Sequence, residues 1–224
     1  MKNSLLGKTL LISSLAIPLT TEASQDFYLS IGGGLALPSD VEGDSNLGGT
    51  NYDATFETQK PGLFSVGFGK EFNDYRFEFN YSKATVESNK IIVTSGGTGV
   101  SSSMTPNLKS DVNSYMFYGY RDFTSDSKLT PYGGIGLGTA TLSAKNQTVT
   151  VAGTNYNFYG GEKTVFSWGL KGGAAYEIAE NTSIYSEASY QNFSSYQISR
   201  GGFATVNYDK THYIGIIAGL KFNF

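Results

Sequence analysis

Hydrophobic and polar residues alternate with a period of two along most of the chain. The clearest run covers residues 75–81, where Tyr and Phe occupy the odd positions and Arg76, Glu78 and Asn80 occupy the even ones. Such alternation predicts β-strands with one apolar and one polar face. It recurs in segments that cover residues 27–37, 64–72, 75–82, 112–123, 129–138, 166–178, 184–191 and 214–224. The sequence therefore predicts an all-β protein with eight strands.

The fourth of these segments has aromatic residues on both of its faces. We place Met116, Tyr118 and Tyr120 on the apolar face, because Arg121 then joins Asn113 on the polar face. This choice lets the charged side chain decide which way the strand faces, since charged residues are rarely exposed to an apolar environment.

The connections between the strands are of two kinds, which alternate along the chain. Three are short and rich in Asn, Asp and Ser, which favour tight turns, and they cover residues 72–75, 124–128 and 179–182. Four are long and polar, and they cover residues 38–60, 87–111, 143–163 and 194–209. In an up-and-down antiparallel barrel all long loops then emerge at one end, and all short turns lie at the other end with both termini.

The composition of the two faces separates a membrane barrel from a soluble one. The polar face holds mostly Gly, Ser and Asn with one or two charges per strand, while the other face is aliphatic and aromatic, with Tyr and Phe crowding the strand ends. A soluble barrel of the lipocalin kind would bury the apolar face and expose many charges, and it is the alternative. A closed barrel with aromatic girdles satisfies every backbone group in lipid. We therefore predict an eight-stranded antiparallel up-and-down transmembrane β-barrel with four long extracellular loops and short periplasmic turns.

The first residues have the layout of an export signal. Lys2 and Lys8 precede an apolar stretch at residues 10–19, which is followed by the small residues Thr21 and Ala23 around Glu22. We expect residues 1–23 to be a cleaved signal peptide and residues 24–224 to be the barrel domain. The chain has no Cys, only 16% charged residues and 28 Gly. Its isoelectric point near 5.2 argues against a nucleic-acid partner.

Three strands resemble those of a known family. Residues 214–224, which end on Phe, look like the closing strand of bacterial outer-membrane proteins, and residues 129–138 and 168–177 resemble strands of opacity-protein-like "porin family" surface proteins. The resemblance implies the outer membrane of a Gram-negative-type bacterium, with its lipids and lipopolysaccharide as surroundings. It also implies that the barrel-assembly machinery reads Phe222 and Phe224 as an assembly signal.

Several charged residues fall on the inward face of the predicted barrel. An eight-stranded barrel is just wide enough for its side chains to fill, and buried charges must be paired. We predict a salt-bridge network that plugs the lumen, with a narrow hydrated channel as the alternative. Its predicted members are Arg76, Glu78, Arg121, Lys171, Glu177, Glu187 and Lys221.

Catalysis and metal binding find little support in the sequence. The only His is His212, and a lipid A deacylase would need a Ser where Ile214 stands. Residues 40–44 hold three alternating carboxylates, but an EF-hand loop would need Gly and Glu at Ser45 and Asn51. We predict no enzyme, no cofactor and no metal site. The acidic segment is expected to be a solvated loop, with weak divalent binding as the alternative.

The long loops are the best candidates for function. They are rich in Ser, Gly, Thr, Asn and Tyr, a composition that suits adaptable hydrogen bonding with aromatic contacts. We expect a surface protein whose loops bind an extracellular ligand, with Tyr156, Phe158, Tyr159 and Tyr196 as candidate contacts. Packing of these aromatic residues on each other is the alternative for them. A small passage for ions or small solutes is the alternative function.

Overall fold

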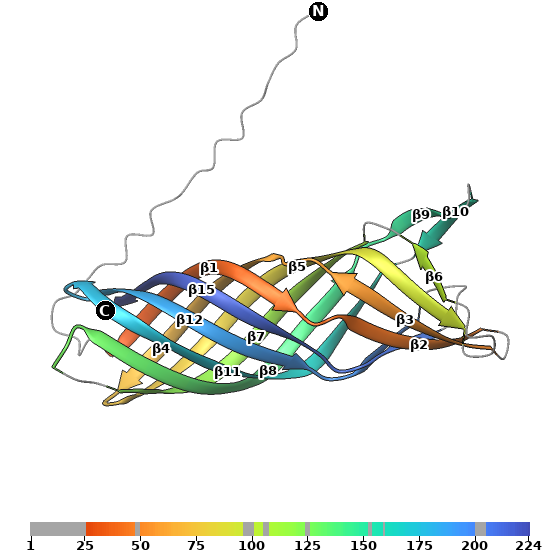
Figure 1. The fold of residues 1–224 in the computed structure, drawn as a ribbon. Helices are drawn as coiled ribbons and strands as arrows, with labels where there is room; N and C mark the ends of the chain where they lie inside the picture. Colours follow the sequence, from red (N-terminus) through yellow and green to blue (C-terminus); the bar gives the residue numbers. More distant parts are fainter. Residues whose placement is uncertain are drawn as a thin grey trace, which may run out of the picture.

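The computed structural model describes residues 26–47, 50–95, 101–104, 108–123, 126–151, 154–158, 160–199 and 205–224, so the predicted signal peptide lies outside the described residues. Within these ranges, eight long strands form a closed antiparallel barrel (Figure 1). They are β1 (Phe27–Pro38), β4 (Gly62–Phe72), β5 (Tyr75–Ser95), β7 (Leu108–Asp122), β8 (Leu129–Ala144), β11 (Gly161–Ala179), β12 (Thr182–Phe193) and β15 (Thr211–Asn223).

Each long strand pairs with the next one along the chain, and β1 pairs with β15 to close the barrel. This is the predicted up-and-down order. The described residues contain no helix that is long and apolar enough to cross a membrane.

One end of the barrel carries tight turns. Asn73 and Asn181 adopt the left-handed conformation there, with φ of 54° and 65°. Asn tolerates this conformation better than most residues, so the predicted turns between β4 and β5 and between β11 and β12 are confirmed. We call this end, which also holds the C-terminus, the turn end (Figure 1).

The other end, which we call the loop end, is built largely from short strands. They are β2 (Val41–Leu47), β3 (Thr50–Thr58), β6 (Ser101–Met104), β9 (Gln147–Val151), β10 (Thr154–Phe158), β13 (Tyr196–Ser199) and β14 (Thr205–Tyr208). The sequence predicts long polar loops for these segments. They form strands because β5 extends to Ser95 and offers β3 an edge to pair with, and β2 and β14 follow in order.

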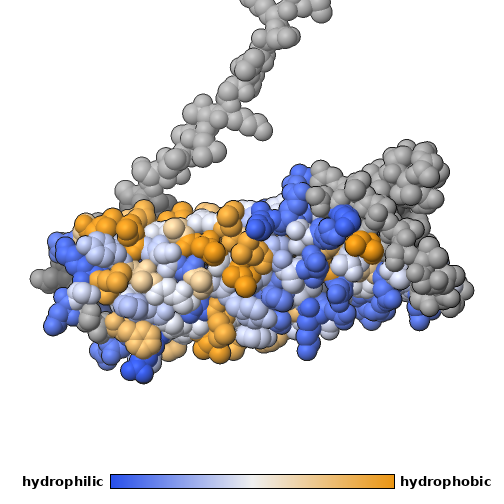
Figure 2. All heavy atoms as spheres, viewed as in Figure 1, coloured by the Kyte–Doolittle hydropathy of each residue, from blue (hydrophilic) through white to orange (hydrophobic). Residues whose placement is uncertain are grey.

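The outer face of the barrel is an apolar band. Its exposed large side chains include Phe27, Leu35, Phe68, Phe79, Phe117, Ile135, Leu137, Phe166, Leu170, Ile216 and Phe222. On the face drawn in Figure 2, hydrophobic residues gather mostly away from the loop end, and hydrophilic residues predominate towards it. Nine residues of a tilted strand, such as residues 27–35, are enough to cross the band of about 25 Å expected in a bilayer.

Strand β7 faces the opposite way from our prediction. Met116, Tyr118 and Tyr120 are buried inside the barrel, whereas Phe117 is 65% exposed on the outer face. Arg121 is exposed too, and its guanidinium lies 5.9 Å from the ring centroid of outward-facing Tyr75. The predicted place of Arg121 in the lumen network is therefore wrong.

Glycines on the neighbouring strand explain this facing. Gly134 and Gly136 of β8 lie where a Cβ atom would collide with the rings of Tyr120 and Tyr118, respectively. The Tyr rings thus fill space that the glycines leave in the narrow lumen. Tyr120 also donates a hydrogen bond to Glu78 Oε1 at 3.1 Å, which satisfies its buried hydroxyl. Packing between strands, and not the single Arg, decides the facing of β7.

Candidate functional site

The lumen holds a cluster of buried charges level with the outer apolar band. The Nζ atom of Lys171 lies 3.0 Å from Glu187 Oε1 and 3.9 Å from Glu78 Oε1, and all three side chains are 7% exposed or less. These residues come from β11, β12 and β5, so the cluster crosses the barrel. Buried charges are tolerated only when each finds an opposite partner and hydrogen bonds, and this cluster provides both.

Neutral side chains complete the shell of hydrogen bonds around the two carboxylates. Glu78 accepts from Asn80 Nδ2 at 2.9 Å and from Ser30 Oγ at 3.1 Å. Glu187 accepts from Tyr132 Oη at 3.1 Å. The empty space left among the side chains of this cluster is about 20 Å³. A single water needs a cavity of roughly 10–15 Å³, so this space has room for about one water molecule.

A second ion pair lies nearer the turn end. Arg76 Nε is 2.8 Å from Asp122 Oδ2, and the guanidinium lies 4.6 Å and 4.7 Å from the ring centroids of Tyr120 and Tyr132. Sequence reasoning missed Asp122 because it inverted the facing of β7. Once Tyr120 is known to face inward, the period of two places Asp122 inward as well.

The remaining predicted network members lie at or near the turn end. Lys221 Nζ is 2.6 Å from Glu71 Oε1, and Asn223 Nδ2 donates to Glu71 Oε2 at 2.9 Å. Glu177 is exposed at the rim of the barrel. The structure therefore brings Glu78, Lys171 and Glu187 together and places Arg76 and Lys221 in separate pairs, while Glu177 lies outside the buried clusters.

An uncharged layer crosses the lumen on the loop-end side of Lys171. Gln191 Nε2 donates to Ser114 Oγ at 3.0 Å and to Ser167 Oγ at 2.9 Å, and Gln191 Oε1 accepts from Tyr213 Oη at 2.6 Å. All four side chains are buried, and they come from β12, β7, β11 and β15. These side chains join opposite walls of the lumen, and they separate the charged cluster from the part of the lumen nearer the loop end.

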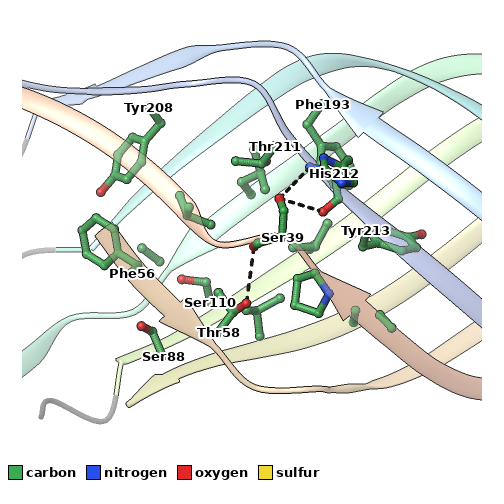
Figure 3. A pocket seen from close by; sticks show the side chains of 18 of the residues that line it. Ser39, Phe56, Thr58, Ser88, Ser110, Phe193, Tyr208, Thr211, His212 and Tyr213 are labelled. Carbon is green, nitrogen blue, oxygen red and sulfur yellow. Dashed lines mark hydrogen bonds between the residues drawn. The ribbon is translucent and has the colours of Figure 1, made fainter. Parts of the chain in front are cut away.

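Above this layer the lumen becomes an apolar cavity of about 120 Å³ (Figure 3). No described residue that lines it is an Asp, Glu, Lys or Arg. Its wall includes buried side chains from five barrel strands, namely Ala36, Ala84, Val112, Phe193 and Tyr213. Sequence reasoning missed this cavity, because inward-facing Ala and Val are apolar residues on the face that we expected to be polar.

Aromatic pairs lie at the two ends of this cavity. Phe193 and Tyr213 have ring centroids 5.8 Å apart beside the Gln191 layer. At the hairpin end the Tyr208 ring is stacked on Tyr196 at 4.8 Å and lies 6.0 Å from Phe56. Tyr196, a predicted loop contact, thus packs on another aromatic residue and lines the cavity.

The other candidate contacts have less definite positions. Tyr156 and Phe158 lie in β10, but their side chains are outside the described set, and Tyr159 is outside the described residues altogether. β9 and β10 pair only with each other among the described strands, and they stand away from the barrel wall in Figure 1.

His212 lies at the wall and away from the buried carboxylates. Its ring centroid is 5.2 Å from that of Tyr190, which itself contacts the partly exposed Trp168. Its backbone carbonyl accepts a hydrogen bond from the Ser39 amide at 2.9 Å, which continues the seam between β1 and β15. In the described part of the chain no three His, Cys, Asp or Glu side chains come together as a metal site.

A closed barrel with an apolar outer band and a polar, hydrogen-bonded lumen is built to sit in a lipid bilayer. These features define an integral β-barrel protein of the bacterial outer membrane. Residues 9–224 match the family described as "Outer membrane protein beta-barrel domain", and the chain belongs to this family.

Known proteins resemble the chain in sequence or in fold. It is 32% identical over 100 residues to outer membrane protein PagN of Salmonella typhimurium, a match that covers 44% of this chain and 42% of that protein. The chain thus aligns with less than half of its curated relative. Among solved structures the fold resembles Neisserial surface protein A (17% identity, TM-score 0.55, covering 90% of this chain and 98% of that one).

Two further solved structures share the fold. OprG of Pseudomonas aeruginosa is 14% identical with a TM-score of 0.56, and the match covers 89% of this chain and 95% of that one. The outer membrane protease OmpT of Escherichia coli is 11% identical with a TM-score of 0.57, and the match covers 89% and 97%. At these identities the likeness shows the fold alone, and this fold includes a protease.

Proposed function

We propose that this outer-membrane protein is a non-enzymatic surface protein, in which the barrel is an anchor and the extracellular hairpins bind a partner outside the cell. The main observation in support of this proposal is that the hairpins extend the hydrogen-bonded wall of the barrel. β2 and β3 continue the backbone ladder between β14 and β5, and so prolong the barrel wall beyond the apolar band. A surface held by backbone hydrogen bonds loses little conformational entropy on binding.

The hairpin of β9 and β10 is the proposed contact element. Its strands pair only with each other among the described strands, and the hairpin stands away from the barrel wall (Figure 1). Tyr156 and Phe158 belong to β10, and Tyr159 follows directly in the sequence. Tyr196 supports the barrel mouth in this proposal and does not need to touch the partner.

Adhesion of bacteria that display the protein tests this proposal. We expect that replacing residues 147–158 with a two-residue Asn-Gly turn abolishes adhesion to cultured host cells or to a matrix-coated surface. The double variant Tyr156→Ser/Phe158→Ser should lower adhesion. The matched double variant Asn155→Ser/Asn157→Ser, at the neighbouring positions of the same strand, should leave it unchanged. Undiminished adhesion by a correctly folded hairpin-deleted protein would refute the role of this hairpin.

The position of His212 supports a non-enzymatic role. A His that acts as a general acid or base must lie within hydrogen-bond reach of its partners, and the His212 ring packs on Tyr190 at the wall. We further propose that the assembly machinery reads Phe222 and Phe224 as the C-terminal signal. Both belong to the outward-facing set at the turn end, where the Phe224 ring lies 6.4 Å from that of Phe68.

A further inference from the structure

We propose that the apolar cavity above the Gln191 layer is a binding site for a small, uncharged apolar molecule about the size of a single aromatic ring. The site is independent of the hairpin contacts discussed above. In this proposal the ligand enters from the extracellular side, binds in the cavity and is not transported across the membrane.

The volume and the lining of the cavity set the class of ligand. An engineered apolar cavity of about 150 Å³ stays dry and binds benzene, and the cavity here is about 120 Å³. A ligand of this kind gains from contact with Ala84, Val112 and Leu142 in the wall and with the Phe193 ring near its base. A charged ligand would lose its hydration without finding a counter-charge, since no described lining residue carries a formal charge.

Three hydroxyl groups in the wall already have backbone partners. Ser39 Oγ donates to the His212 carbonyl at 3.1 Å, Thr58 Oγ1 to the Ser39 carbonyl at 3.4 Å and Ser88 Oγ to the Glu57 carbonyl at 2.9 Å. The first two of these bonds are drawn in Figure 3. A buried water needs two to four polar partners. Hydroxyl groups that already donate to the backbone hold water weakly. An apolar ligand therefore loses little binding free energy by displacing water from them.

The barrel wall and the layer below leave the loop end as the way in. β1 and β15 stay paired up to Pro38 and Tyr213, and the Ser39 amide extends this seam by one further bond to the His212 carbonyl. A lateral route through this seam is therefore closed at this level. Below the cavity, Gln191 and its three partners cross the lumen. A ligand that enters is retained and does not pass through.

Methyl NMR of the refolded full chain in lipid nanodiscs, titrated with benzene, tests the site. Benzene also partitions into lipid, so outward-facing Ala218 serves as an internal reference. We expect saturable shifts for the Ala84, Val112 and Leu142 methyl groups, which line the cavity, and a linear, non-saturating response for Ala218. A linear response at all of these methyl groups would overturn the proposal, because benzene would then only dissolve in the membrane. The absence of any saturable response would also overturn the proposal, because the cavity would then be filled by water or by the chain itself.

Two variants and one control make the test specific. Ala84→Leu fills the cavity and should abolish the saturable response, while Ala218→Leu adds the same group on the lipid side and should preserve it. Phe56→Ala enlarges the cavity from the hairpin side, where the barrel fold is least affected, and should allow naphthalene to bind saturably. If Ala84→Leu does not fold, the proposal is tested by whether Phe56→Ala, unlike the wild type, binds naphthalene saturably. An unchanged preference would refute the assignment of the site to this cavity.

Discussion

At Lys171 one ammonium group lies close to two buried carboxylates, those of Glu187 and Glu78. We expect Lys171→Ala to lower the free energy of unfolding by about 3–5 kcal/mol, because it leaves two buried negative charges without a cation. Urea unfolding in lipid vesicles, followed by the mobility shift between unheated and boiled samples, measures the loss. The double variant Lys171→Met/Glu187→Gln removes one charge of each sign and should regain part of it. Equal stability of Lys171→Ala and the wild type would contradict the ion-pair cluster.

The glycines of β8 provide a second prediction at the residue scale. A Cβ atom at Gly134 would collide with the Tyr120 ring, whereas a Cβ atom at the adjacent Gly133 would meet nothing within 4 Å. We expect Gly134→Ala to destabilise the barrel by about 1–3 kcal/mol through overpacking. The matched variant Gly133→Ala, on the lipid side, should be close to neutral. The same unfolding assay compares the two, and similar losses for both would show that backbone freedom, and not space for Tyr120, is what these glycines supply.

At the scale of elements, the roots of the hairpins are held by side chains between neighbouring strands. Asp111 of β7 accepts a hydrogen bond from Thr85 Oγ1 of β5 at 2.7 Å and lies 3.2 Å from Lys145 Nζ after β8. The Thr85 hydrogen bond and the Lys145 ammonium group lower the pKa of the Asp111 carboxyl below its ordinary value. The other pairs at this level, such as that of Lys109 with Glu87, are more exposed and contribute little.

This carboxylate makes hairpin stability depend on pH. Because the folded pKa of Asp111 is depressed, its contribution is present at pH values above the ordinary Asp pKa of about 3.9 and is lost as the pH falls through the folded pKa. We expect acidification from neutral pH to below about 3 to speed amide hydrogen exchange at the loop ends of β7 and β8, after correction for the intrinsic rate. Asp111→Asn should show faster exchange already at neutral pH and a smaller pH effect. An identical pH response in both proteins would exclude Asp111 as the cause.

On the scale of the whole molecule, the lumen consists of layers with different chemistry. Towards the turn end lie the Arg76 and Lys171 ion pairs, then the Gln191 layer, and then the apolar cavity below the hairpins. The Lys171 cluster and the Gln191 layer each join side chains from opposite walls, so a hydrated ion that enters from the turn end meets first a packed charged cluster and then an uncharged layer. The proposed roles in surface contact and apolar binding both use the extracellular side of these layers.

This layering predicts the electrical behaviour of the barrel. We expect the refolded protein to show no regular single-channel steps in planar bilayers, since the free space of about 20 Å³ in the charged cluster has room for about one water molecule. The heat-modifiable mobility of the same sample confirms that it is folded. Gln191→Ala should open the uncharged layer without opening the charged one and should stay silent. Reproducible steps from the folded wild type would favour the passage of ions as the function.

The sequence by itself determined the architecture. Alternation with a period of two is a local property, so it revealed the eight strands, the apolar outer face and the short turns without reference to any partner. The inward facing of Arg76, Glu78, Lys171 and Glu187 followed from the same alternation, because their strands carry apolar residues on one face only.

Only the tertiary structure decided what depends on neighbouring strands. The sequence predicted the wrong inward face for β7. Tyr118 and Tyr120 fit inside the barrel only beside the glycines of β8, and this match joins residues that are distant in the sequence. The hairpins at the loop end form because strand edges become available there. The apolar cavity exists because small side chains from separate strands, such as Ala36 and Ala84, meet at one level of the lumen, and no stretch of the chain contains that information alone.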